Sequence, residues 1–204
     1  MASQISHIIY AQKYLEKHPL PNGDKDLFIL GSTFPDIRHI DENVKRKHTH
    51  MAFNPVDLNF EGLTPFQAGW KFHVYCDMKR EEILNKYNFY DISETAKHEN
   101  APSKSLEDVL LYERNNNWEK TCLYLNNTQF FSQDLPVSVE VFQLWYAIVG
   151  KYIEKSPDER TIRIFLNKIL KSTDKTKSIM ESFEKLKNNE KAKSILLKVV
   201  EEIV

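Results

Sequence analysis

The stretch from Thr64 to Lys86 constrains the fold more than any other part of the chain. Threonine is a favourable N-cap and Pro65 suits the first helical position, so the pattern predicts one long helix here. Its faces carry the apolar or chemically active residues Phe66, Trp70, His73, Val74, Tyr75, Cys76, Asp77 and Leu84. A helix that is apolar nearly all round has to be buried, so we expect the rest of the chain to pack around it.

Helical periodicity continues on both sides of this stretch, and glycine (5) and proline (8) are scarce. The short apolar run 27–30 is also interpreted as helical, because no second strand is evident to pair with it. Further helices are predicted over 3–17 with Ser3 as cap, 105–126, 139–154, 156–171 with Ser156 as cap, and twice within 173–204.

These elements predict an all-α fold, a single-domain bundle of roughly seven or eight helices over residues 1–204. Residues 1–90 form its metal-site half, and residues 100–204 form a helical C-terminal half. Between the helices, Pro19 to Gly23 is expected to be a turn, and residues 38–47 and 54–62 are expected to be loops.

Composition and charge argue against several classes of protein. The formal net charge is -1 over 204 residues. The chain therefore lacks the basic excess that would imply a stable nucleic-acid complex. No run approaches the roughly 20 apolar residues of a membrane span, and the first residues lack the pattern of a signal peptide, so we expect a cytoplasmic protein. Cys76 and Cys122 lie far apart in the sequence and are expected to be free thiols. The sequence identifies no protein partner.

His73 and Asp77 are the first candidate ligands for a metal ion. They are four residues apart, so they lie on one face of the predicted helix and both can reach one ion. A buried carboxylate is costly unless it is paired, and a divalent cation is one remedy. The alternative is an ordinary pair between Asp77 and an arginine, a lysine or His73 itself. Gly69, one turn earlier, would let another backbone or a ligand approach closely.

The other candidates lie earlier in the chain, where five of the seven histidines fall between His7 and His50. Asp36 follows a Phe-Pro pair that should force Phe34 out of the α region, although Asp36 could instead cap a helix. His7 and His50 lie in apolar surroundings, where a histidine can also be a hydrogen-bonded core residue. His48 is the less favoured substitute for His50.

Several other polar and aromatic side chains are weaker candidates for a functional role. His18 and His39 lie in polar, loop-like contexts and are expected to be exposed. Arg38 and Lys71 could face a phosphate but are more readily explained as surface charges. The aromatic residues that could line a pocket, or belong to the core, are Tyr10, Trp70, Tyr75 and Trp145.

Taken together, the candidates supply three imidazoles and two carboxylates: His7, Asp36, His50, His73 and Asp77. Imidazole with carboxylate suits zinc, although iron, manganese or nickel would also accept these ligands. Zinc with an open coordination position lowers the pKa of bound water to about 7, which makes a nucleophile. The pattern therefore predicts one or two zinc ions, or another divalent transition metal.

In order and spacing these residues resemble the zinc-dependent phospholipase C and P1 nuclease superfamily, which are all-helical metallohydrolases. The family pattern is an early histidine, Gly-x-x-x-Pro-Asp, a histidine some fourteen residues later, and Gly-x-x-x-His-x-x-x-Asp. His7, Gly31 to Asp36, His50, and Gly69 to Asp77 match it in that order, within residues 4 to 86.

The resemblance implies a role for each matched residue. Asp36, His50, His73 and Asp77 would hold the principal metal, and His7 with Asp77 would reach a neighbouring ion. Asp36 could also be catalytic, by orienting or deprotonating the attacking water. The family's ligands for a third ion have no counterpart here, which favours one or two ions.

The expectation is therefore a zinc-dependent hydrolase, a phosphodiesterase or phosphomonoesterase that uses a metal-activated water. Its substrate would be a nucleotide, a phospholipid headgroup or a small phosphomonoester. One alternative is a non-catalytic, metal-stabilised helical protein that serves as an interaction module. Another is that no metal binds and these groups form a buried polar network.

Overall fold

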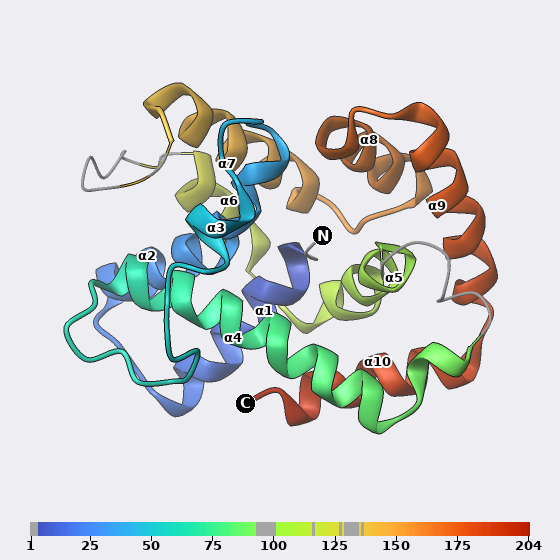
Figure 1. The fold of residues 1–204 in the computed structure, drawn as a ribbon, viewed down its shortest axis with the longest axis horizontal. Helices are drawn as coiled ribbons and strands as arrows, with labels where there is room; N and C mark the ends of the chain where they lie inside the picture. The colour runs from blue at the N-terminus through green and yellow to red at the C-terminus, as the bar shows by residue number, and fades with distance from the viewer. Residues whose placement is uncertain (1–3, 93–100, 116, 127, 129–134, 136) are drawn as a thin grey trace.

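The computed structural model describes residues 4–92, 101–115, 117–126, 128, 135 and 137–204. Every regular element within these ranges is helical (Figure 1). The α-helices are α1 (Gln4–Lys17), α2 (Asn22–Thr33), α3 (Arg46–Thr49), α4 (Pro65–Lys86), α5 (Ala101–Leu111), α6 (Trp118–Asn126), α7 (Val139–Ile153), α8 (Glu159–Leu170), α9 (Thr173–Lys187) and α10 (Glu190–Glu202). Three 3-10 helices are η1 (Phe34–His39), η2 (Phe89–Asp91) and η3 (Tyr112–Arg114). No helix in the described part of the chain is long and apolar enough to cross a membrane.

The central helix predicted from the sequence is α4, and its start is confirmed. The Thr64 hydroxyl accepts a hydrogen bond from the Gln67 N–H at 3.3 Å, and the Gln67 side chain accepts one from the Thr64 N–H at 3.0 Å. This capping box satisfies two N–H groups that the first turn leaves unpaired. The middle of α4 is buried, with α2, α1 and α10 packed against it (Figure 1).

The contact between α2 and α4 is unusually close because a glycine lies on each side of it. A Cβ added to Gly31 would lie 2.0 Å from the backbone oxygen of Phe66. A Cβ added to Gly69 would lie 2.0 Å from the backbone oxygen of Phe28. Of the two roles that the sequence left open for Gly69, close approach of another backbone is therefore the one observed. The backbone in question is that of α2.

The segment before Asp36 differs from the prediction. Gly31 lies inside α2, and Phe34 remains in the right-handed helical region with φ −62° and ψ −45°. Pro35 then occupies the first turn of the 3-10 helix η1. Proline is tolerated there because its missing N–H would have had no partner. Packing of Gly31 against α4 outweighs the weak conformational bias that a proline imposes on the residue before it.

The helix count was also wrong, since ten α-helices lie in the described ranges instead of seven or eight. The predicted helix 105–126 is divided into α5, η3 and α6. The division falls where Asn115 and Asn117 hydrogen-bond to nearby backbone. The Asn117 side chain accepts from the Lys120 N–H at 3.2 Å and so starts a new helix. The other additional helix is the short α3, which begins in the predicted loop 38–47 and ends at Thr49. The helix predicted at 27–30 is α2, which begins earlier, in the predicted turn.

The C-terminal elements follow the prediction closely. α7 ends one residue before the predicted boundary, and 173–204 forms the two expected helices α9 and α10. α8 begins later than expected because Asp158, not Ser156, is its cap and accepts from the Thr161 N–H at 2.7 Å. The predicted Ser3 cap of α1 lies outside the described residues. α8 and α9 lie beside each other and α9 packs on α5, while α10 packs on both α5 and α4 (Figure 1).

Candidate metal centre

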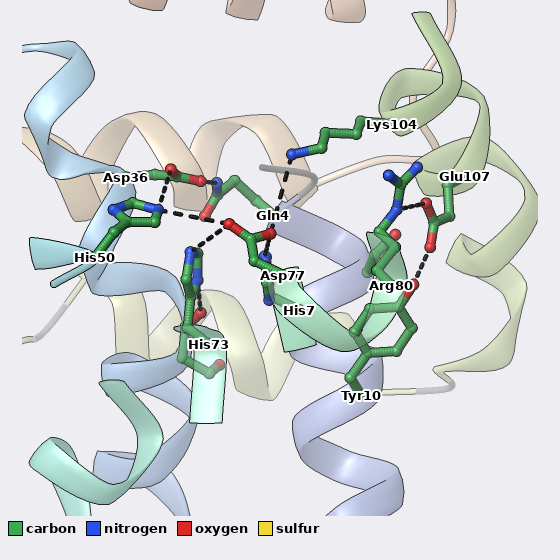
Figure 2. Close-up of polar contacts among 12 residues, drawn as sticks. Gln4, His7, Tyr10, Asp36, His50, His73, Asp77, Arg80, Lys104 and Glu107 are labelled. Atoms are coloured by element: carbon green, nitrogen blue, oxygen red, sulfur yellow. Dashed lines mark hydrogen bonds and ion pairs between the residues drawn. The ribbon is translucent and has the colours of Figure 1, made fainter. Parts of the chain in front are cut away.

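The five candidate ligands converge on one place, although they come from four separate elements (Figure 2). His7 lies on α1, Asp36 on η1, His50 directly after α3, and His73 and Asp77 on α4. We call these five residues the His/Asp cluster. Four are buried, and the Asp77 side chain retains 21% exposure. The cluster is therefore closed on the core side and reaches solvent at Asp77.

The atoms of the cluster approach one another without forming hydrogen bonds. His50 Nε2 lies 3.5 Å from Asp77 Oδ2 and 3.7 Å from Asp36 Oδ1. His73 Nε2 lies 3.7 Å from Asp77 Oδ2. These N···O distances are longer than that of a normal N–H···O hydrogen bond. They are close to the distance of about 3.4 Å that separates two ligand atoms of a tetrahedral zinc ion with bonds of about 2.1 Å. The spacing thus fits groups that share an ion better than a hydrogen-bonded polar network.

Two of these atoms are buried and have no hydrogen-bond partner. They are His73 Nε2 and Asp36 Oδ1. Buried polar atoms are nearly always paired, so an unpaired nitrogen and an unpaired carboxylate oxygen in one cluster call for an explanation. A divalent cation coordinated by both would satisfy them together. The donor set therefore fits a metal.

A backbone carbonyl orients His73, and a threonine hydroxyl contacts His50. His73 Nδ1 lies 2.7 Å from the Ser32 carbonyl oxygen, which can only accept, so the proton is on Nδ1 and Nε2 carries a lone pair. The close α2–α4 contact brings that carbonyl within reach. His50 Nδ1 lies 3.0 Å from the Thr49 hydroxyl, and the Thr49 carbonyl accepts from the Trp70 indole at 2.6 Å. Such outer contacts orient ligating imidazoles.

His7 occupies a different side of the cluster. Its ring stacks on that of His73 with centroids 3.8 Å apart, and its Nε2 lies 3.4 Å from Asp77 Oδ1. Two sets of residues could each hold an ion, because the candidate ligand atoms within each set lie within 4.8 Å of one another. Both sets include His73. Because Nδ1 of His73 is engaged with Ser32, its Nε2 can coordinate only one of the two ions. His7 and Asp77 Oδ1 are the atoms that remain for a neighbouring ion.

The protonation states already suit metal binding. Burial raises the pKa of Asp77, but the Lys104 ammonium and the contacts with His50 and His7 outweigh it and hold this pKa well below its ordinary value. Burial likewise raises the pKa of Asp36, and contacts with histidines, above all His39, hold it well below. Burial holds the pKa of His73 well below 6.5. Metal ligands must be ionised carboxylates and neutral imidazoles, which is the state favoured at Asp36, Asp77 and His73.

These shifts predict how the stability of the metal-free protein depends on pH. Because the pKa of His73 is below 6.5 in the fold, the unfolded chain binds a proton first as the pH falls through 6.5, and the free energy of unfolding decreases. The limiting slope is about 1.4 kcal/mol per pH unit for one such proton. The depressed pKa values of Asp36 and Asp77 add a second loss below 3.8.

Urea unfolding with a chelator present, between pH 7.5 and 5.5, measures this dependence. His73→Gln should show a shallower pH dependence than the wild type, because it lacks the titrating group. A midpoint that stays constant or rises on acidification would contradict the assignment.

Sequence reasoning missed three neighbours of the cluster. The Gln4 amide donates to Asp36 Oδ2 at 2.8 Å, His39 Nε2 lies 3.6 Å from Asp36 Oδ1, and Lys104 Nζ lies 4.0 Å from Asp77 Oδ1. The prediction that His39 is exposed is wrong, since its side chain is 15% exposed. Its position three residues after Asp36 was a usable signal, because that spacing places both on one side of a helical turn. Nothing local marked Gln4 or Lys104.

The other candidates are placed away from the cluster. His48 Nδ1 accepts from the Lys45 N–H at 3.1 Å at the start of α3, and His18 is exposed as expected. Lys71 is not a surface charge but is buried and paired with Asp57 at 2.6 Å. The candidate aromatics do not line the pocket at the cluster. Those buried in the core are Tyr10, Trp70 and Trp145, and Tyr75 is half-buried.

A pocket of about 610 Å³ opens beside the cluster and is lined by His50 and Asp77. Positive side chains from three elements share its wall, namely Arg46 of α3, Arg80 of α4 and Lys104 of α5, together with Glu81 and Glu82 of α4. Arg80 is buried and paired with Glu107 at 2.7 Å. The free thiols predicted at Cys76 and Cys122 are present, and neither lines this pocket. A molecule in the pocket would contact the exposed side of the His/Asp cluster together with cations.

Comparison with protein-family models, with curated proteins and with solved structures finds no match to this chain. The resemblance to the phospholipase C and P1 nuclease superfamily therefore rests on the order, spacing and placement of the His/Asp cluster alone.

Proposed function

We propose that this protein is a metal-dependent hydrolase, with zinc as the metal, that cleaves a phosphoester with a metal-activated water. The observation that carries the proposal is the convergence of imidazole and carboxylate atoms at 3.5–3.7 Å, with His73 Nε2 and Asp36 Oδ1 unpaired, beside a pocket that Lys104 and two arginines help to line. Cations beside a metal site suit a substrate with a negatively charged phosphate.

Asp36, His50, His73 and Asp77 are the residues that would hold the principal ion, and His7 with Asp77 Oδ1 would contribute to a neighbouring one. A bound divalent ion supplies Lewis-acid stabilisation of phosphoryl charge and lowers the pKa of water at the site. Iron or manganese would accept the same imidazole and carboxylate donors.

Asp36 is the residue that we assign to the attacking water. Gln4 holds its Oδ2, while its Oδ1 has no hydrogen-bond partner and can accept from another group. Because its pKa is held well below the ordinary value, Asp36 is a weak proton acceptor. Its role is therefore to orient the water and to bind the ion. A nucleotide, a phospholipid headgroup and a small phosphomonoester are all compatible with the pocket volume.

We expect protein purified without a metal-affinity tag to contain one or two zinc ions and to hydrolyse p-nitrophenyl phosphate or its bis ester. Asp36→Asn should lower kcat at saturating zinc by at least about a hundredfold, the upper range for losing a residue that orients a metal site. The measurements are elemental analysis and the release of nitrophenolate. The matched control is Asp91→Asn, an exposed aspartate in η2, which should keep wild-type activity. Zinc content below about half an equivalent, with no uptake on titration, would refute the proposal.

A second candidate function is a structural metal in a non-catalytic interaction module. The specific observation in its favour is that Asp36, His50, His73 and Asp77 would supply four protein ligands, the number that fills a structural zinc site. In that case zinc removal would lower the unfolding temperature, and none of the phosphoesters would be hydrolysed. Tight zinc binding without any turnover of either nitrophenyl ester would favour this alternative.

A further inference from the structure

Lys104 is a charged residue of the pocket that lies next to the proposed metal centre without being one of its ligands. Its side chain is 13% exposed and its Nζ lies 4.0 Å from Asp77 Oδ1, beyond hydrogen-bond distance (Figure 2). Within the described residues, the contact with Asp77 is the ion pair of Lys104. A lysine this buried needs a counter-charge, and a loose contact with one carboxylate oxygen satisfies it poorly.

The helix that carries Lys104 is held firmly in place. One turn further along α5, Glu107 accepts from Arg80 Nε at 2.7 Å and from the Tyr10 hydroxyl. Asp108 accepts from the Ser6 N–H at 2.9 Å and from the Tyr152 hydroxyl at 2.9 Å. These buried contacts tie α5 to α1, α4 and α7. The base of the Lys104 side chain is therefore positioned by packed helices.

Metal binding changes the charge balance around Lys104. If Asp77 coordinates a cation, its negative charge is shared with that cation and neutralises Lys104 less. Arg80 is committed to Glu107, and Arg46 is an exposed residue of α3. Lys104 then becomes the inner cation of the pocket, next to the metal, without a full counter-charge. An anion that binds the metal from the pocket side would supply it.

We propose that Lys104 is the phosphoryl-binding residue of this pocket: its ammonium binds a non-bridging oxygen of the phosphate and makes the site select phosphomonoesters over phosphodiesters. Selection follows from charge, because a monoester phosphate carries about two negative charges near neutral pH and a diester carries one. The inference rests on the proposed function, but the binding of inorganic phosphate tests it without any turnover.

The test uses the zinc-loaded, full-length protein and inorganic phosphate, with binding followed by calorimetry. Lys104→Met, which keeps the length of the side chain and removes its charge, should weaken phosphate binding at least about tenfold, as expected for a charge-assisted hydrogen bond. Lys104→Arg should stay within about threefold of the wild type. The control is Lys79→Met, on α4 but paired with Glu82 at 2.8 Å, which should bind phosphate as the wild type does.

Catalysis gives a second readout. In Lys104→Met, KM for p-nitrophenyl phosphate should rise, and the preference for this monoester over the bis ester in kcat/KM should fall about tenfold. Wild-type phosphate affinity and wild-type preference in Lys104→Met, with normal zinc content, would overturn the inference while the proposed function stands. Lys104-dependent phosphate binding without any hydrolysis would support the anion site and refute the hydrolase.

A measurement on the wild-type chain covers the case in which Lys104→Met does not fold or loses zinc. Acetic anhydride labels accessible lysines, and mass spectrometry quantifies each site. Phosphate should protect Lys104 from labelling in the zinc-loaded protein and leave Lys79 unchanged. Equal labelling of Lys104 with and without saturating phosphate would overturn the inference.

Discussion

The His73→Ala variant should lose at least about a hundredfold in zinc affinity, more than any other single substitution in the His/Asp cluster. His73 belongs to both groups of atoms that could hold an ion, and its unpaired Nε2 is fully buried. The Ser32 carbonyl fixes the orientation of the imidazole, and a water molecule in its place would not be oriented in this way. Hydrolysis should fall with the zinc occupancy. A competition titration with a chromophoric chelator measures the affinity.

The matched control for this substitution is His48→Ala. His48 lies in the same part of the sequence as His50, but its Nδ1 accepts from the Lys45 N–H, and it belongs to neither group of candidate ligands. Zinc affinity should therefore be that of the wild type. Circular dichroism of both variants separates a lost ligand from a lost fold. If a folded His73→Ala protein binds zinc as tightly as the wild type does, the assignment of the principal ion is refuted.

Gly69→Ala should destabilise the protein by about 3 kcal/mol or more, the upper range for overpacking a tight contact. The added Cβ would lie 2.0 Å from the backbone oxygen of Phe28, and a backbone atom cannot swing aside as a flexible side chain does. α2 and α4 would have to separate. The separation would draw the Ser32 carbonyl away from His73, so zinc affinity should fall as well, by about tenfold to a hundredfold.

The control is Gly23→Ala, in the first turn of α2, where an added Cβ meets nothing within 4 Å. This substitution should leave stability unchanged or raise it by up to about 1 kcal/mol, because alanine restricts the unfolded chain. Chemical unfolding of both variants gives the comparison. Equal stability of Gly69→Ala and the wild type would show that the two helices can separate without cost, contrary to the packing described.

The central helix was predictable because its signals are local. Thr64 and Pro65 specify its start, and apolar side chains on every face require burial whatever packs against them. The same holds for the two C-terminal helices, whose apolar stripes are visible in the sequence. The division of 105–126 was missed, because side chains such as Asn117 compete with the helix through single hydrogen bonds that a periodicity does not reveal.

By itself the sequence determined which candidate ligand residues the protein carries. The identities and order of His7, Asp36, His50, His73 and Asp77 predicted an imidazole and carboxylate site, and the i, i+4 pair required two of its members to share a face. Zinc, phosphoester hydrolysis and the residue roles stay predictions until the experiments above are done. The arrangement of the five side chains in space could not be predicted, because local spacing does not specify how separate helices pack.

Only the tertiary structure decided how the site is assembled and what surrounds it. The contact of Gly31 and Gly69 with opposing backbone brings the Ser32 carbonyl to His73, and folding brings Lys104 to Asp77 from a different helix. Both contacts join residues that are far apart in the sequence, so no periodicity links them. They depend on how closely two helices pack, which is set by volume and by hydrogen-bond satisfaction across the whole core.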